Sequence, residues 1–165
     1  MDASNKKMSI IYLKGDATRP SSLGNKIIVH ICNDIGKWGK GFVLAVSKKW
    51  REPEERYKDS FSNPTPPKLG DVQFINVEPE IIIANIIGQH GVRSSRNKNL
   101  PPPIRYDAVK KGLERIAEYA EKHNASVHMP RIGCGLAGGE WEEIESIINT
   151  TLIQKNIKTN VYDFE

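Results

Sequence analysis

The amino-acid sequence predicts an α/β layered domain with a largely parallel β-sheet. Short strand-like runs alternate along the chain with segments of helical periodicity, and no internal repeat divides it. The length of 165 residues suits one domain. A chain of that length buries roughly 70% of the surface that its unfolded form exposes. We therefore expect residues 1–165 to form a single domain, with residues 1–7 as a flexible N-terminal tail.

Six segments predict strands, because each is a continuous apolar run or an alternation of apolar and polar residues. In chain order they are residues 9–13, 26–31, 72–77, 81–87, 125–129 and 159–164. The second and fourth are apolar enough to lie inside the sheet.

Three segments carry an apolar stripe at helical spacing: residues 41–50, 106–122 and 141–152. Gly112 interrupts the second of them, at a cost of about 1 kcal/mol relative to alanine. Residues 59–70 and 88–103 predict loops rich in proline or polar residues. Loops of that length in a small domain are often functional.

Composition excludes several classes of protein. The chain has 24 Lys and Arg against 20 Asp and Glu, a net charge of +4, with 38% hydrophobic and 27% charged residues. Wholesale disorder is excluded, and the scattered basic residues do not predict a nucleic-acid binder. No apolar run reaches the roughly 18–20 residues of a membrane span, and no signal-peptide core follows Met1. Cys32 and Cys134 fit neither a disulfide framework nor a zinc motif. We expect a cytoplasmic monomer that needs no metal or cofactor.

Ligands of such folds bind at the carboxyl ends of the strands. Two of the segments after predicted strands, 32–41 and 131–139, are glycine-rich and lead into helices at Phe42 and Trp141. Glycines let backbone N–H groups approach a phosphate, and a helix N-terminus favours negative charge. The pair therefore predicts a diphosphate held from both sides, although each turn alone is also typical of an ordinary strand-to-helix connection. Neither matches the dinucleotide fingerprint or the Walker A pattern.

Several side chains near these ends have two interpretations. Asp16 either hydrogen-bonds an adenine amino group or caps its own turn. Trp38 either walls a ligand or folds back onto the core. His90 lies at a strand's carboxyl end, where acid–base chemistry is conceivable. Cys134 is a nucleophile only beside a base and otherwise a small buried residue. The remaining histidines in strands, His30 and His128, and the tryptophans Trp50 and Trp141 are interpreted as structural.

The chain resembles the macrodomain family of ADP-ribose-binding modules over essentially its whole length. The resemblance is carried by residues 12–17, by residues 30–34 with the glycine loop after them, and by residues 129–136. The last segment is similar to the branch that contains the terminal ADP-ribose protein glycohydrolase and the macrodomain of a chromatin remodeller. The resemblance implies a three-layer α/β/α sandwich with a mixed, largely parallel six-stranded sheet.

By the same resemblance, Asp16 takes the adenine N6 beside the Ala17 backbone, and the two glycine loops embrace the diphosphate and distal ribose. Phe164 packs by the adenine or its ribose. The expected ligand-binding residues are Gly15, Asp16, Ala17, Asn33, Gly36, Trp38, Gly39, Lys40, Gly41, Phe42, Arg131, Ile132, Gly133, Cys134, Gly135, Leu136, Ala137 and Phe164.

The sequence departs from the hydrolytic branches of that family at three positions. The glycohydrolase branch uses a lysine at the end of a strand where this chain has Gly88 or Gln89, and an aspartate where it has Ala137. Another branch carries an aspartate where this chain has Val43. Any catalysis must therefore differ in mechanism.

The function expected from this resemblance is removal of mono-ADP-ribose from glutamate or aspartate side chains of proteins. We assign Asn33 and Asp34 to orient the ribose or a water molecule, and Gln89 or His90 to face the leaving group. Replacing Asn33 and Gln89 should lower turnover with ADP-ribose affinity largely intact.

Arg93 and Arg105, on or beside the long loop, are expected to meet an acidic protein. The partner is thus ADP-ribose or an ADP-ribosylated protein. The alternatives are an ADP-ribose 1''-phosphate phosphatase and an ADP-ribose reader without turnover.

Overall fold

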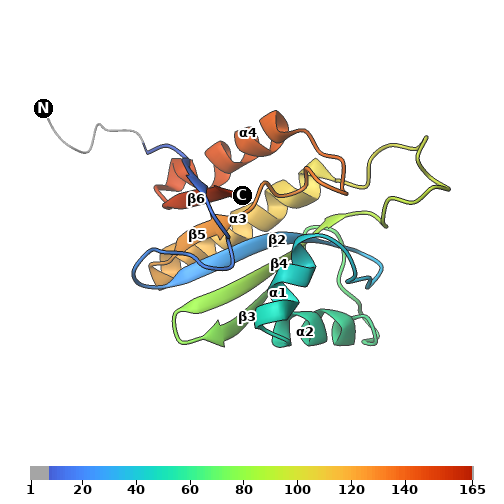
Figure 1. The fold of residues 1–165 in the computed structure, drawn as a ribbon, viewed down its shortest axis with the longest axis horizontal. Coiled ribbons are helices and arrows are strands. Elements are labelled where there is room, and N and C mark those ends of the chain that lie inside the picture. The colour runs from blue at the N-terminus through green and yellow to red at the C-terminus, as the bar shows by residue number, and fades with distance from the viewer. Residues whose placement is uncertain (1–7, 165) are drawn as a thin grey trace, which may run out of the picture.

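Six strands form one sheet in the order β1-β6-β5-β2-β4-β3 in the computed structural model, which describes residues 8–164 (Figure 1). In chain order the strands are β1 (Ile11–Lys14), β2 (Lys26–Asn33), β3 (Val72–Glu78), β4 (Ile81–Gln89), β5 (Ser126–Met129) and β6 (Thr159–Asp163). Every neighbouring pair is parallel except β3 with β4. The predicted mixed, largely parallel six-stranded sheet is confirmed. The predicted tail, residues 1–7, lies outside the described residues.

The strands that approach the site are longer than their sequence pattern predicts. β2 continues two residues past Ile31 to Asn33, and β4 continues to Gln89. Asn33 pairs with Gln89 after an irregularity in the ladder at Cys32. Two polar side chains are therefore fixed at adjacent strand ends rather than in loops.

Four helices and a short 3-10 turn complete the fold. They are α1 (Phe42–Lys49), α2 (Glu52–Ser60), α3 (Tyr106–His123), α4 (Trp141–Thr151) and η2 (Ile153–Lys155). The sequence pattern does not predict α2, because most of its residues are polar or charged and only Pro53 and Tyr57 are buried. Its start is nevertheless typical of a helix, with Pro53 and three glutamates in the first turn. The predicted loop from residue 59 begins only after Ser60.

The helices cover both faces of the sheet, which gives the expected three layers (Figure 1). One core lies between the sheet and α3 with α4, and includes Leu113 and Ile144; the other lies under α1 and α2, and includes Val46 and Tyr57. Gly112 belongs to the close approach of α3 to β4, since a Cβ there would lie 2.6 Å from Ile86 Cγ2. The glycine that weakens the helix pattern is thus required by packing.

The carboxyl ends of the five parallel strands face one edge of the sheet, and the loops after them gather there. These loops are residues 15–25, 34–41, 90–105 and 130–140. In Figure 1 the third of them projects from the body of the molecule. Over residues 8–164, none of the helices combines the length and apolar character that crossing a bilayer requires.

Candidate functional site

Two adjoining cavities form one cleft at this edge, with volumes of about 190 Å³ and about 370 Å³. They share Ile31, Lys40, Val43, Gln89 and Leu136 as walls. The smaller cavity is further lined by His30, Gly41, Phe42, Pro130, Arg131, Ile132, Gly133, Gly135 and Ala137. The larger is further lined by Cys32, Asn33, Lys37, Gly39, Val92, Arg93 and Ser94. Many residues of both predicted glycine loops thus face one continuous hollow.

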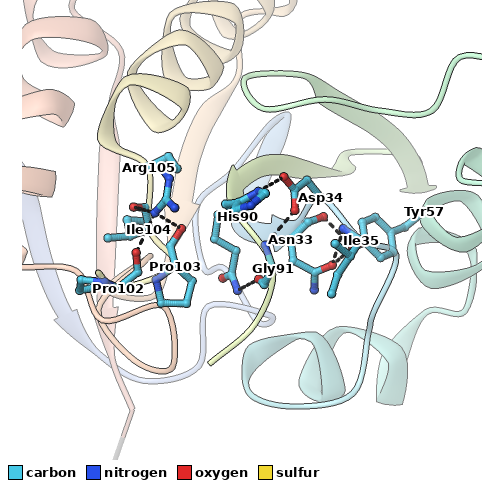
Figure 2. A network of polar contacts seen from close by, with 11 residues as sticks. Asn33, Asp34, Ile35, Tyr57, His90, Gly91, Pro102, Pro103, Ile104 and Arg105 are labelled. Atoms are coloured by element: carbon cyan, nitrogen blue, oxygen red, sulfur yellow. Dashed lines mark hydrogen bonds and ion pairs between the residues drawn. The ribbon is translucent and has the colours of Figure 1, made fainter. Parts of the chain in front are cut away.

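Asn33 shapes the first glycine loop, residues 34–41 (Figure 2). Its side-chain oxygen accepts hydrogen bonds from the backbone N–H groups of Ile35 at 3.0 Å and Lys37 at 3.1 Å, and its amide donates to the Lys37 carbonyl at 2.6 Å. The Tyr57 hydroxyl, from α2, lies 2.7 Å from both the main-chain and side-chain oxygens of Asn33. Burial raises the pKa of Tyr57 far above its ordinary value, so the hydroxyl stays a donor. Asn33 therefore fixes the loop as well as lining the larger cavity.

Trp38 folds back onto the core, the second of its two interpretations. Its indole N–H donates to Ser47 Oγ at 2.7 Å, and its ring centroid lies 5.4 Å from those of His30 and Tyr57. It is buried and lines neither cavity. Trp38 therefore anchors the first glycine loop to the core, and its expected contact with a ligand stays a prediction.

The second glycine loop, residues 130–139, closes on itself through backbone hydrogen bonds. Gly139 N–H donates to the Gly133 carbonyl at 2.7 Å, and Gly138 N–H donates to Gly135 at 3.0 Å. Gly133 and Gly138 both have φ of +75°, which favours glycine. A Cβ on Gly139 would lie 2.5 Å from the Gly133 oxygen, whereas one on Gly135 would meet nothing within 4 Å. Gly133, Gly138 and Gly139 thus serve the loop's conformation, and Gly135 leaves open space in the cleft.

Arg131 is tied to the sheet edge rather than free to meet a ligand. Its Nε donates to Asp163 Oδ1 at 2.6 Å and its Nη2 to Oδ2 at 3.1 Å. The guanidinium lies 5.1 Å from the Tyr12 ring centroid and 5.0 Å from that of Trp141. These hydrogen bonds hold the pKa of Asp163 below its usual value. Trp141, interpreted as a core residue, is only partly buried and stacks in this surface cluster.

Asp16 caps its own turn, since its Oδ1 accepts from the Thr18 N–H at 2.8 Å and the Thr18 hydroxyl at 2.7 Å. Partial burial raises the pKa of Asp16. The hydrogen bonds from Thr18, helped by the charges of Lys49 and Arg19, outweigh this and leave the pKa below its ordinary value. The second carboxylate oxygen accepts no hydrogen bond within the described chain. Asp16 can therefore cap the turn and still accept from a ligand.

The ends of β1 and β6 bring Gly15 beside Phe164. Gly15 N–H donates to the Asp163 carbonyl at 2.9 Å, and Phe164 is 82% exposed. Neither residue lines the two cavities. They lie at the far end of the strand edge from β4, where a long ligand could continue.

Asp34 and His90 are hydrogen-bonded to each other at the rim (Figure 2). His90 Nδ1 lies 2.7 Å from Asp34 Oδ2, and Gly91 N–H donates to Asp34 Oδ1 at 2.8 Å. The His90 side chain is 63% exposed, and neither residue lines the cleft. Of the four predicted catalytic residues, only Asn33 and Gln89 face the cleft, and Gln89 lines both cavities.

The two arginines near the long loop differ in position. Arg105 Nη1 donates to the carbonyls of Pro102, Pro103 and Ile104, at 2.7, 3.0 and 2.9 Å, so it holds its own segment together instead of pointing to a partner. Arg93 lines the larger cavity. The residues expected from the sequence do not include three that line the larger cavity: Lys37, Val92 and Ser94. Lys37 lies within the first predicted glycine loop, and for Val92 and Ser94 the length of the loop after β4 is the available signal.

The charged side chains that line the cleft are all positive. Its lining includes Lys37, Lys40, Arg93 and Arg131, and no aspartate or glutamate. Backbone N–H groups of two glycine loops add to this positive lining. The cleft is suited to a phosphate-bearing or otherwise anionic ligand. Within residues 8–164, no three His, Cys, Asp or Glu side chains are grouped so as to hold a metal ion.

Two buried histidines support the sheet, as predicted. His30, in the floor of the smaller cavity, has its Nε2 2.6 Å from Asn85 Oδ1, and burial lowers its pKa to about 4 against a hydrogen bond that raises it. Burial and the charges of Lys26 and Lys158 lower the pKa of His128 to about 4.

This predicts a protein that loses stability in mild acid. Unfolded histidines bind protons below pH 6.5, whereas the folded ones stay neutral until about pH 4. The contribution of the two neutral histidines to the free energy of unfolding should therefore be complete above pH 6.5. It should fall by about 1 kcal/mol per pH unit for each histidine as the pH drops toward 4. Denaturant unfolding at pH 7.5 and at pH 5 measures the difference in the free energy of unfolding. Equal stabilities at the two pH values would contradict the neutral, buried state of both rings.

Comparisons with known proteins agree with this architecture. No family model matches the chain. A macrodomain protein from Streptomyces coelicolor is 46% identical with a TM-score of 0.83, covering 94% of this chain and 99% of that chain. A protein of unknown function from Bacteroides thetaiotaomicron is 56% identical with a TM-score of 0.90, covering 94% and 98%.

Curated relatives are more distant. The mouse chromodomain-helicase-DNA-binding protein 1-like is 32% identical over 94% of this chain, which spans only 18% of that protein's length. The Candida albicans ADP-ribose 1''-phosphate phosphatase is 26% identical over 93% of this chain and 98% of its own. The bovine ADP-ribose glycohydrolase OARD1 is 25% identical over 93% and 90%.

Proposed function

This chain belongs to the macrodomain family, and from that premise we propose that it binds ADP-ribose and hydrolyses the ester that links ADP-ribose to a glutamate or aspartate side chain. The observation that carries the proposal is a cleft between two glycine loops, lined by cations and by no carboxylate. A diphosphate is the ligand group that such a lining favours. Two relatives named for acting on ADP-ribose derivatives support the same ligand.

The strand order suggests the direction in which the ligand lies. Asp16 and Phe164 follow β1 and β6 at one side of the edge, while Asn33 and Gln89 end β2 and β4 at the other. We place the adenine near Asp16, the diphosphate between the glycine loops, and the distal ribose in the larger cavity. The protein acceptor then leaves the cleft past β4 and the loop 90–103.

Hydrolysis in this cleft relies on positioning. The ester at the anomeric carbon is labile, so an anchored ribose and an oriented water molecule supply much of the needed help. Asn33 and Gln89 are the amides at the expected ribose position. Asp34 and His90, paired outside the cleft, hold the strand end that carries Gln89.

Three activities are separated by two measurements on the purified protein. Calorimetry with ADP-ribose tests the ligand. Incubation with a glutamate-modified transferase and with ADP-ribose 1''-phosphate then tests the reaction, by detection of free ADP-ribose and of free phosphate. Release of ADP-ribose from the protein supports the hydrolase, phosphate release alone supports a phosphatase, and binding without product supports a reader. Absence of binding would refute all three.

Gln89→Ala is expected to lower the turnover of the glutamate-linked substrate by about tenfold or more and to change the ADP-ribose Kd by less than about threefold. The reason is that the proposal assigns Gln89, which lines both cavities, to the distal ribose and the leaving group, and assigns the diphosphate to the glycine loops. Single-turnover rates and calorimetry measure the two quantities. Gln154→Ala, an exposed glutamine on η2, is the matched control. A rate equal to that of the unaltered protein would remove Gln89 from the mechanism.

A further inference from the structure

Arg93 is a fixed cation in the wall of the larger cavity. Its side chain is half-buried, and Nη1 donates to the carbonyl oxygens of Asn97 and Leu100, each at 3.2 Å. Two hydrogen bonds to backbone leave the guanidinium little freedom. A cation held in this way needs little reorganisation to receive an anion.

The charge of Arg93 is not neutralised within the described part of the chain. The ion pairs there involve other groups, and in the cleft the guanidinium of Arg131 is already bound by Asp163. Lys37 and Lys40 are exposed amines on the first glycine loop. Arg93 is thus the half-buried cleft cation that keeps its charge for a ligand.

The free edge of Arg93 has the geometry that binds a carboxylate. No hydrogen bond among residues 8–164 uses its Nε or Nη2, and these two nitrogens form one side of the planar fork. Arg131 uses that same pair of nitrogens to hold both oxygens of Asp163. Arginine recognises carboxylates in this bidentate manner, which a lysine ammonium does not reproduce.

Arg93 also lies where the acceptor is expected. A Cβ on Gly138 would lie 3.5 Å from Arg93 Nη2, so the guanidinium reaches from the long loop to the second glycine loop. It lines the larger cavity together with Asn33 and Gln89, at the expected distal ribose. The next group along the ligand from that ribose is the modified side chain.

We propose that Arg93 binds the carboxylate of the leaving group and thereby selects acidic side chains as the acceptors of ADP-ribose. The inference rests on the proposed function. In the hydrolysis, the oxygen of water bonds to C1'' of the ribose, the bond from C1'' to the acyl oxygen breaks, and its electron pair leaves on the carboxylate. The proton of water passes to solvent. Arg93 stabilises the charge that develops on the departing oxygens.

The test compares Arg93→Gln and Arg93→Lys with the unaltered protein on a glutamate-linked ADP-ribosyl peptide. Arg93→Gln is expected to lower kcat/KM by about 10- to 100-fold, with ADP-ribose affinity within about threefold, because the lost contact is to the leaving group. Arg93→Lys should recover part of the loss, since it keeps the charge without the fork. The Kd of the intact peptide relative to that of ADP-ribose gives a second readout that needs no turnover, and Arg93→Gln should abolish any advantage of the peptide.

Asn97→Ala controls for a merely structural role. Asn97 holds the same loop by accepting from the Ser94 N–H at 2.8 Å and donating to the Val92 carbonyl at 2.9 Å, and the substitution keeps the Asn97 main-chain carbonyl to which Arg93 donates. An equal loss in Asn97→Ala and Arg93→Gln would overturn the inference, as would an Arg93→Gln variant with unchanged kcat/KM and peptide affinity. A loss for ADP-ribose 1''-phosphate and none for the peptide would also overturn it. Failure of the unaltered protein to bind ADP-ribose would instead refute the proposed function.

Discussion

Gly139→Ala is expected to abolish measurable ADP-ribose binding and to lower the free energy of unfolding by about 2–4 kcal/mol. The added Cβ would lie 2.5 Å from the Gly133 carbonyl oxygen, which is backbone and cannot rotate away. That oxygen also accepts a hydrogen bond from the Gly139 N–H at 2.7 Å, so the hydrogen bond that closes the second glycine loop must break. Thermal unfolding and calorimetry measure the two losses.

Gly135→Ala is the matched control in the same loop. A Cβ at Gly135 meets no protein atom within 4 Å, and its φ is not in the left-handed region. Its melting temperature should therefore stay within about 2 °C, while the new methyl narrows the cleft and weakens ADP-ribose binding by about tenfold. Normal binding by Gly139→Ala would show that the closed loop is not needed; normal binding by Gly135→Ala would show that the ligand does not approach Gly135.

Asn33→Ala is expected to weaken ADP-ribose binding and to destabilise the protein by about 3 kcal/mol, because several buried hydrogen-bonding groups lose their partner. This differs from the expectation drawn from the sequence, in which only turnover falls. The reason for the difference is that the Asn33 amide holds Ile35 and Lys37 in the first glycine loop. Calorimetry measures the ADP-ribose affinity, and denaturant unfolding measures the free energy of unfolding.

Tyr57→Phe separates the contributions around Asn33. It removes the hydroxyl that contacts Asn33 and leaves the bonds from Asn33 to the loop. About 1 kcal/mol of stability should be lost, with a smaller effect on affinity than Asn33→Ala. Wild-type affinity in Asn33→Ala would show that the loop keeps its shape without the amide.

The periodic parts of the fold could be predicted from the sequence, because a helix or strand that is buried on one face carries apolar residues at a regular spacing. β1 is recognisable as a short apolar run although Ile11 and Tyr12 are exposed; the other five strands and three of the helices follow this rule. α2 does not, since it buries only Pro53 and Tyr57 and its other residues meet solvent. The extension of β2 to Asn33 and of β4 to Gln89 was also missed, because polar residues at a strand end resemble the start of a loop.

The parts of the candidate site that contain glycine-rich segments could be predicted from the sequence. The side chains whose positions depend on contacts between residues far apart in the chain could not. The two glycine loops do line the cleft. Trp38 lies in a glycine-rich segment that predicts a loop, yet its side chain packs in the core, where it contacts Ser47 and Tyr57. The pairing of Asp34 with His90 joins residues 56 positions apart in the chain, and the approach of Arg93 to Gly138 joins residues 45 positions apart. No local pattern contains such contacts.

β2 and β5 are hydrogen-bonded neighbours, and the two glycine loops continue from their ends. Their ladder joins Lys26–Ile28 to Ser126–His128, so β5 ends beside the middle of β2, and β2 continues along β4 to Asn33. The first glycine loop therefore begins farther along the sheet than the second, and a ligand held by both loops, as proposed, has to span an offset that the two strand lengths determine.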